Sequence, residues 1–426
     1  MKAARNVLFV LCLICLCAGA VSAGGGNQGR GSGPVTVQFH YNAWNTGLEV
    51  IAELIDEFNA SQSEVVIEGS FGGGWEESNK KLLASLVAGD TPALAMVAMA
   101  YNAPFLVEGH FEDLSAYMAK DTEVTESDFM KALLDLNRYN GKVYGLPLAC
   151  SAPILYYNKD IFRKAGLDPD KPPAAWNDVY SYAQKIRALG PEYTGLLFNR
   201  SNGYISMGMV RAFGSNWIAQ DNSTVLWTDK GAVEALQLVQ KIHNEGLGVY
   251  QGDEASMVGS GMTGMWVQTC ADVGKFLRDL GYDWGNAPLP AQVTQSEPIG
   301  GGSIYMFKNS PQAQKDGAWK FMKFLVSPES QSRWSSATGY VFTTQAALNY
   351  PAVQDQLRRE PRYGVVYGPL AEYAVAQDTT QLIPFVEVLD IFNKLWDDTI
   401  LNNGDAVRNS AEAQAQANRI IAPYKK

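Results

Sequence analysis

The spacing of apolar and polar residues changes repeatedly along the chain, and each change predicts a new strand or helix. Over residues 35–41, apolar and polar positions alternate, which is typical of a strand with one buried face. Over 48–58, apolar positions recur every three or four residues, as they do on one face of a helix. The first hundred residues therefore predict strand 35–41, helix 48–58, strand 65–67, helix 82–87 with Gly89 as its stop, and strand 94–98.

The same alternation of strands and helices continues to the end of the chain. It predicts strand 154–157, helix 176–189, strand 196–198, helix 233–242 capped by Asp229, strand 304–307, helix 319–325 and an almost entirely helical tail from Pro384. Proline-containing breaks at 145–148 and 286–290 interrupt this order. Strands that alternate with helices are typical of βαβ units, so the predicted fold class is α/β, with largely parallel strands in two sheets and proline-marked crossings between them.

The N-terminus has the composition of an export signal. Lys2 and Arg5 precede an apolar run over 7–17, and small residues follow as far as Ala23. The run is too short to span a bilayer. We predict a signal peptide over 1–23 and a flexible, glycine-rich tether over 24–33. A soluble periplasmic protein is the preferred interpretation, and a lipid-anchored form is the alternative.

Composition excludes several classes of protein. The 426 residues are 46% hydrophobic, which is typical of a folded globular chain rather than a disordered one. The net charge of −10 argues against an extended surface for nucleic acid or anionic membrane. The chain has only three histidines, and no two of them are at ligand-motif spacing, so no metal site is predicted. Removal of the signal peptide would leave two of the five cysteines, Cys150 and Cys270, whose pairing the sequence does not decide.

Motifs for catalysis are weak. Residues 259–264 match G-x-G-x-x-G, but no strand clearly precedes them, and chance explains the match in a chain with 40 glycines. The neighbouring carboxylates at 76–77 and 397–398 fit solvated helix faces better than an acid/base pair, because adjacent helical side chains point about 100° apart. No catalytic residue and no cofactor is predicted. A glycosidase would need two facing carboxylates, which the sequence neither shows nor excludes.

Tryptophans give a stronger indication of function. Trp44, Trp217 and Trp266 are expected in loops, and Trp75 is expected to open a helix after the glycines at 72–74. The remaining tryptophans considered, Trp176, Trp319, Trp334 and Trp396, fall in helical patterns and are expected in the core. Loops beyond the carboxyl ends of strands line the ligand crevice of an open α/β sheet. Aromatic rings there offer flat faces to the C–H surfaces of a sugar, and their N–H or O–H groups can reach its hydroxyls. Several loop aromatics together favour a carbohydrate-binding site.

A set of longer motifs resembles the family 1 extracellular solute-binding proteins, the sugar-binding subunits of ABC importers. The matching segments are GKVYGLPL at 141–148, PILYYNKD at 153–160, AGLDP at 165–169, PPAAW at 172–176, GGGS at 300–303, AWKFMKFLVSP at 318–328 and TGY at 338–340. The resemblance implies two lobes that close on a ligand and three crossings, near 147–152, 288–291 and 342–345. It divides the chain into an N-terminal lobe of 34–148 and 291–342, and a C-terminal lobe of 149–290 and 343–426.

The resemblance also implies ligand-binding residues. The family's binding positions correspond to Trp75, Ser151, Gly301, Gly302 and Tyr340. The full predicted site adds Trp44, Tyr101, Arg200, Tyr204 and Trp266.

Two positions depart from the members that bind glycerol phosphate. Met99 replaces an acidic residue, with Tyr101 nearby, and no arginine occurs over 377–381. Arg200 is the candidate replacement for that arginine, although an ordinary surface role is the simpler interpretation. A neutral sugar or polyol is therefore at least as well supported as glycerol 3-phosphate or a related phosphodiester.

The predicted function is a non-catalytic receptor that binds a carbohydrate or polyol and delivers it to the permease of an ABC importer. It is expected to act as a periplasmic monomer without a nucleic-acid partner. A secreted carbohydrate-active enzyme and a purely sensory sugar receptor remain as alternatives.

Overall fold

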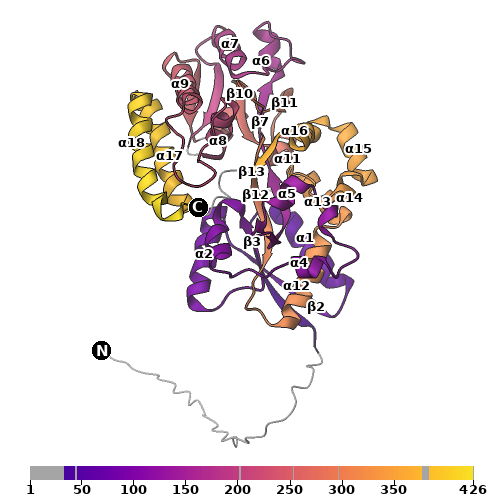
Figure 1. Cartoon of the computed structure of the whole chain (residues 1–426). Coiled ribbons are helices and arrows are strands. Elements are labelled where there is room, and N and C mark those ends of the chain that lie inside the picture. Colours follow the sequence, from indigo (N-terminus) through magenta and orange to yellow (C-terminus); the bar gives the residue numbers. More distant parts are fainter. Residues whose placement is uncertain are drawn as a thin grey trace, which may run out of the picture. The chain divides into compact units, whose positions relative to one another are not determined.

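Two β-sheets organise the part of the chain that the computed structural model describes, which is residues 33–43, 46–200, 203–252, 254–295, 297–376 and 383–425 (Figure 1). The first sheet has the strand order β13 (Ala374–Ala376), β12 (Glu297–Met306), β3 (Leu94–Ala98), β1 (Val35–Tyr41) and β2 (Val65–Phe71), and β6 (Gly145–Ser151) also pairs with β12. The second sheet has the order β11 (Trp284–Pro288), β7 (Pro153–Asn158), β10 (Thr263–Thr269), β8 (Thr194–Asn199) and β9 (Gly248–Gln251). We call the part built on the first sheet the first lobe and the part built on the second sheet the second lobe.

The first lobe buries β1 and β3 beneath amphipathic helices. Its principal helices are α1 (Thr46–Ser61), α2 (Trp75–Ala88), α12 (Gln312–Leu325) and α13 (Pro328–Thr338). Helix α1 directs Ile51, Leu54 and Phe58 into the core, where they meet Phe39 of β1. The rings of Phe39 and Phe58 both contact Phe321 of α12, with centroids 5.4 and 5.1 Å away. The predicted helical spacing over 48–58 is thus explained by burial of one face.

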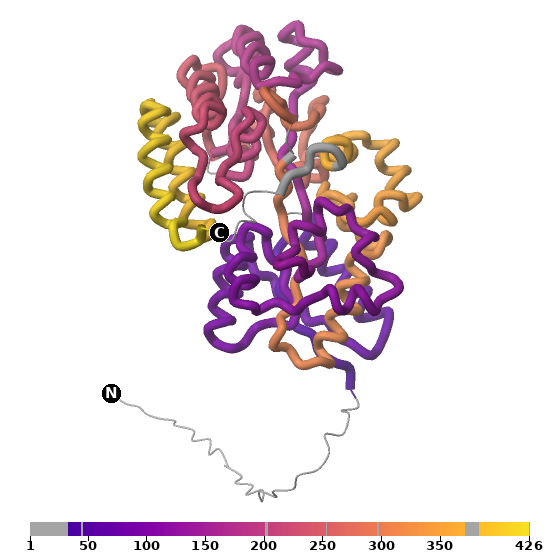
Figure 2. The backbone as a smooth tube through the Cα atoms, in the orientation of Figure 1, coloured from indigo at the N-terminus to yellow at the C-terminus, as the bar shows by residue number. Residues whose placement is uncertain are grey.

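The second lobe has a separate core. Its helices include α6 (Lys159–Lys164), α7 (Trp176–Arg187), α8 (Gly203–Ala212), α9 (Lys230–Asn244), α17 (Phe385–Ile400) and α18 (Ala406–Ile421). Helices α17 and α18 come from the end of the chain, yet they pack beside α9, as Figure 2 shows. Trp396 of α17 stacks on Phe198 of β8 with ring centroids 5.5 Å apart. The C-terminal tail therefore completes the core of a lobe whose last strand, β11, ends at Pro288.

The predicted strands and helices are present, but the prediction of largely parallel strands is wrong. Strands β1, β2 and β3 pair in parallel, as do β8, β9 and β10, whereas β12 runs antiparallel to β3 and β6, and β7 runs antiparallel to β10 and β11. Strand β12 reverses direction because the chain enters the first sheet from the second lobe. Asp229 does lie at the N-cap of α9, but its side chain makes no capping hydrogen bond. Gly89 ends α2 in the left-handed conformation, as predicted.

The chain changes sheet abruptly at Ala152, the one residue between β6 and β7. Its backbone N–H lies 3.4 Å from the Sγ of Cys270, and its carbonyl accepts from the backbone of Cys270 at 2.8 Å. A second passage, whose described part is 289–295, lies between β11 and β12. The segment near Thr343 lies against the first passage, because the hydroxyl of Thr343 donates to the carbonyl of Pro147 at 2.9 Å. The lobe boundaries stay a prediction, since contacts join residues 34–426 into one unit.

Cys150 and Cys270 are both buried, and no disulfide joins them. Burial raises the pKa of the Cys150 thiol. Within the described residues, no helix has the length and hydrophobicity that a bilayer span requires. The predicted signal peptide and most of the tether lie outside the described residues.

Candidate functional site

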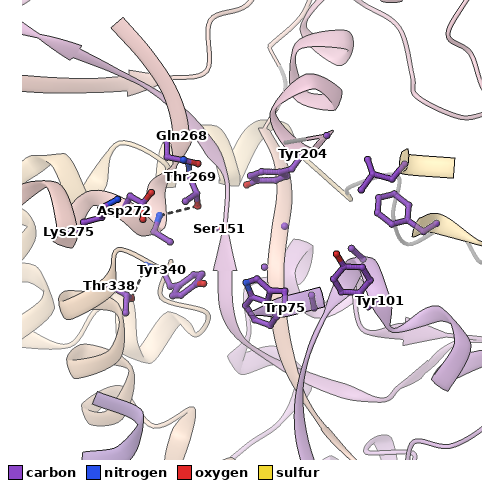
Figure 3. Close-up of a pocket in the computed structure, with 18 of the residues that line it drawn as sticks. Trp75, Tyr101, Ser151, Tyr204, Gln268, Thr269, Asp272, Lys275, Thr338 and Tyr340 are labelled. Carbon is purple, nitrogen blue, oxygen red and sulfur yellow. Dashed lines mark hydrogen bonds between the residues drawn. The ribbon is translucent and has the colours of Figure 1, made fainter. Parts of the chain in front are cut away.

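A cavity of about 650 Å³ lies where the two lobes meet, at the carboxyl ends of β3, β6 and β10 (Figure 3). The residues that line it come from both lobes: Thr46, Trp75, Ala98, Ala100, Tyr101, Ser151, Gly203, Tyr204, Gln268, Thr269, Ala271, Asp272, Lys275, Gly300, Gly301, Thr338, Tyr340, Phe385 and Leu389. Open α/β sheets bind ligands at this end of their strands. The cavity has the size of a small-molecule site.

Trp75 is the first residue of α2 and projects into the cavity (Figure 3). Gly73, at a φ of +96°, and Gly74 at the N-cap turn the chain from β2 into this helix. The indole lies over Gly302 of β12, where a Cβ atom would come within 2.5 Å of the ring. Glycine at 302 is therefore required for the position of the Trp75 ring.

Tyr340 follows α13, and contacts with the end of that helix hold it in place. Gly339 caps the helix at a φ of +100°, and the backbone N–H of Tyr340 donates to the Thr338 hydroxyl at 3.2 Å. The Tyr340 ring stacks on Trp334 with centroids 5.6 Å apart and an interplanar angle of 2°. Burial raises the pKa of the Tyr340 phenol, and a side-chain hydrogen bond with Trp75 opposes that rise. Tyr340 thus presents a neutral hydroxyl beside Trp75.

Ser151 and Gly301 form the part of the cavity nearest the crossing. Ser151 ends β6 opposite Gly300 of β12, and Gly301 pairs with Cys150. Gly301 has a φ of +95°, and a Cβ there would stand 1.9 Å from the carbonyl oxygen of Ala149. A side chain at 301 would therefore both strain the backbone and separate the two strands. The absence of side chains here leaves backbone groups open to a ligand.

The second lobe contributes a polar wall from the end of β10 and the start of α11 (Val273–Asp279). Gln268, Thr269, Asp272 and Lys275 line the cavity there. The Thr269 hydroxyl accepts from the backbone of Ala271 at 3.2 Å, which shapes the turn that follows the strand. This wall carries the cavity's two formally charged side chains among the described residues, Asp272 and Lys275.

A buried carboxylate supports that wall from behind. Glu254 is 8% exposed and accepts hydrogen bonds from Gln268 and from Asn199, the latter at 3.0 Å. Burial raises the pKa of Glu254 to about 7, and the charge of Asp272 adds to the effect, while Gln268, Lys275 and Asn199 lower it. Burial also raises the pKa of Asp272, against the lowering effect of Lys275. This polar wall of the second lobe, which we call the second wall, therefore has carboxyl groups on it and behind it whose ionised forms are disfavoured by burial.

Tyr101, Tyr204 and Phe385 line the opposite end of the cavity. Tyr204 belongs to α8, and Phe385 begins α17. The two helices approach closely, since a Cβ on Gly203 would come within 2.2 Å of the Leu389 side chain. Burial is the main cause that raises the pKa of the Tyr101 phenol, and the charges of Glu76 and Asp390 raise it further. This end of the cavity thus combines aromatic rings with a neutral hydroxyl at Tyr101.

The structure brings six of the predicted site residues to the cavity: Trp75, Tyr101, Ser151, Tyr204, Gly301 and Tyr340. Gly302 lies directly beneath the Trp75 ring. Trp44 lies outside the described residues. The contacts of the predicted site residues with a ligand stay a prediction.

Two predicted site residues lie elsewhere. Trp266 is 0% exposed in β10, where it stacks on Tyr156 with centroids 5.6 Å apart, so the prediction of a loop position is wrong. Trp217 is also fully buried. Arg200 forms an ion pair with Asp397 of α17 at 2.8 Å and does not line the cavity. It therefore has the surface role that the sequence left as the simpler interpretation.

Sequence reasoning missed Gln268, Thr269, Asp272, Lys275 and Phe385. One local signal was present for Asp272, because an aspartate just before an apolar periodic segment indicates a helix start. Nothing in the sequence places that start against Trp75. Among the described residues, no group of three or more His, Cys, Asp or Glu side chains could hold a metal ion.

Comparisons with known proteins agree on one family. The family of bacterial extracellular solute-binding proteins matches residues 53–360. The chain is 25% identical over 362 residues to the sn-glycerol-3-phosphate-binding periplasmic protein UgpB of Escherichia coli K12. The aligned region covers 81% of this chain and 82% of that protein.

Solved structures give the same architecture. UgpB from Mycobacterium tuberculosis in complex with glycerophosphocholine matches with a TM-score of 0.83 at 22% identity, over 92% of this chain and 99% of that one. The sugar-binding protein MalE from Xanthomonas citri matches with a TM-score of 0.79 at 20% identity, over 91% of this chain and 98% of that one. The predicted two-lobed α/β fold is therefore confirmed.

Proposed function

Because this chain belongs to the bacterial extracellular solute-binding proteins, we propose that it captures a carbohydrate or polyol in its interlobe cavity and delivers it to the permease of an ABC importer. The family consists of transport components rather than enzymes, which agrees with the predicted non-catalytic role. The observation that carries the ligand class is the lining of the cavity, where aromatic rings and uncharged hydrogen-bonding groups outnumber charged side chains.

A sugar ring fits the chemistry of this lining. The exposed face of Trp75 offers a flat surface to C–H groups, and the hydroxyls of Tyr340 and Ser151 line the same cavity. Backbone groups near Gly301 are within reach because no side chain covers them. No arginine lines the cavity among the described residues, so a bidentate grip on a phosphate is missing from its walls.

A glycerol phosphodiester is the second candidate. Its support is the similarity to proteins named for glycerol 3-phosphate and to a structure that holds glycerophosphocholine. Lys275 is the one cationic side chain of the described lining that could face a phosphate. The two candidates differ in charge, so binding experiments separate them directly.

Capture would proceed by lobe closure. A ligand that contacts both the Trp75 side and the Gln268 side of the cavity is bound more tightly when those sides approach, so it favours the closed state. The passages at Ala152 and over 289–295 are where the lobes would rotate. The closed shape would then be what the permease recognises.

The finer assignments follow from the sequence. We propose that residues 1–23 are removed on export, and that the mature chain is a soluble monomer of the periplasm without a nucleic-acid partner. A lipid-anchored form is the alternative location. A sensory sugar receptor would have the same cavity and differ only in its membrane partner.

Isothermal titration calorimetry of the chain without residues 1–23 tests the ligand class. The panel consists of glucose, galactose, maltose, glycerol, glycerol 3-phosphate and glycerophosphocholine. We expect saturable binding of at least one carbohydrate or polyol, with a negative heat-capacity change from burial of the Trp75 face. A folded protein that binds no member of the panel would contradict the proposal, and turnover of a chromogenic glycoside would favour the enzyme alternative.

A further inference from the structure

The charged wall of the cavity points to a narrower class of ligand. We propose that Asp272 receives an ammonium group, so that the preferred ligand is a sugar, polyol or glycerol derivative that carries one. This inference rests on the proposed function, because it concerns the same cavity. It adds a residue that decides which members of that ligand class bind.

The carboxylate of Asp272 is a hydrogen-bond acceptor that no described residue uses. It occupies the N-cap of α11, a position where an aspartate side chain ordinarily accepts from the backbone of the first helical turn, yet it makes no such bond. Within the described part of the chain, neither a hydrogen bond nor an ion pair engages its carboxylate. Because Asp272 also lines the cavity, the open partner positions of its carboxylate are accessible to a ligand.

Lys275 does not neutralise Asp272 by direct contact. The two residues share α11, but no ion pair joins them, and the Lys275 ammonium lies 5.5 Å from the centroid of the Phe276 ring. Behind the wall, the charge of Asp272 raises the pKa of the Glu254 carboxyl group. A cationic guest beside Asp272 would offset the repulsion between these two groups, whereas an anionic guest would add to the negative charge there.

The surroundings of Asp272 favour a cation as well. Burial already raises the pKa of this carboxyl, so an ionised Asp272 gains more from a positive partner than an exposed aspartate would. Tyr340 lies near enough to feel the charge of Asp272, and its ring, with Trp75 beside it, presents aromatic faces to the same space. An ammonium group in that space would meet a carboxylate and the electron-rich faces of aromatic rings together.

The same arrangement disfavours a bare phosphate. A doubly charged phosphate that approached Lys275 would also approach the carboxylate of Asp272 and be repelled by it. An ammonium group on the ligand would offset that repulsion. Primary amines and choline-type quaternary amines share this chemistry, and matched ligands distinguish them, because only a primary amine can donate hydrogen bonds to the carboxylate.

The test is calorimetric titration of matched ligand pairs into the chain without residues 1–23. The pairs are glucosamine with glucose, galactosamine with galactose, and glycerophosphocholine with glycerol 3-phosphate. The variant Asp272→Asn removes the charge and keeps the shape. The control variant Asp279→Asn removes a carboxylate that pairs with Arg278 on the same helix and does not line the cavity.

We expect the ammonium member of at least one pair to bind about tenfold or more tightly than its partner in the wild type and in Asp279→Asn. Asp272→Asn should abolish this preference while it leaves binding of the neutral sugars, glucose and galactose, within about threefold. Equal binding within every pair, unchanged by Asp272→Asn, would overturn the ammonium inference and leave the proposed function intact. Failure of every ligand to bind would contradict both.

Discussion

The two walls of the cavity differ in the kinds of side chain that line them. On the first-lobe side, Trp75 and Tyr340 present aromatic surface and no formal charge, and Gly301 bares the backbone. On the second-lobe side, Asp272 and Lys275 carry charge. The difference indicates that one wall contributes contact area and the other discriminates between ligands by charge.

The residues that lie behind the two walls also differ in whether they carry an ionisable group. Trp75 rests on a glycine, and Tyr340 rests on Trp334, so neither position places a charged group out of water. The second wall is backed by Glu254, which is nearly buried and held by Gln268. The second wall thus lowers the stability of the fold through its buried carboxyl group, whereas the aromatic wall does not.

The largest effect is expected from Trp266, the fully buried tryptophan beneath the second wall. Trp266→Ala should lower the free energy of unfolding by about 3–5 kcal/mol, because it removes a large core side chain and leaves a cavity. Denaturant unfolding measures the loss, and titration of the protein that remains folded should give nearly the wild-type affinity. A large loss of affinity at unchanged stability would instead place Trp266 in the site.

The next effect is the pH dependence that Glu254 introduces behind the second wall. Its pKa is raised from 4.5 to about 7, so the folded state retains a proton that the unfolded chain releases. The contribution of Glu254 to stability should therefore be greatest below about pH 4.5, fall by about 3 kcal/mol as the pH rises to about 7, and stay level above that.

Glu254→Gln tests this effect, because the neutral amide does not titrate. Urea unfolding across that pH range should show a shallower decline for the variant than for the wild type. The same slope in both proteins would mean that Glu254 is ionised in the folded state at an ordinary pKa, and that the second wall carries no such cost.

A smaller effect is expected from Trp75 on the aromatic wall. Trp75→Ala should weaken ligand binding by about 10- to 50-fold and change the melting temperature little, because the ring is only partly buried and the lost contacts are with ligand. Gly302→Ala should act in the same direction by displacing the ring. Calorimetry and thermal unfolding of both variants measure this, and unfolding of Trp75→Ala at room temperature would show that the ring belongs to the core.

The order of the elements could be predicted because burial leaves a periodic trace. Strand β1 has the predicted bounds, and α9 and the helical tail follow from apolar residues at helical spacing. Strand direction could not be predicted, because it depends on the lobe from which the chain enters a sheet. Trp266 was misplaced because β10 is almost entirely buried, and a strand buried on both faces shows no alternation of apolar and polar residues.

The aromatic wall of the site was largely predictable and the charged wall was not. Trp75 and Tyr340 follow glycine-marked turns and belong to motifs that resemble a family. Asp272 and Lys275 are ordinary residues of a helix start, and they matter only because β10 ends opposite a different lobe. Tyr340 is 8% exposed and stacked, so replacement by alanine would disturb the core, and Tyr340→Phe is the sharper change.

The burial of the tryptophans determines how this protein will appear to an optical experiment. Trp176, Trp217, Trp227, Trp266, Trp334 and Trp396 are all fully buried, and their emission will be blue and insensitive to what enters the cavity. Of the described tryptophans, Trp75 lines the cavity. A ligand will therefore change total fluorescence only slightly over a large constant background, whereas its protection of Trp75 from a soluble quencher will report occupancy directly.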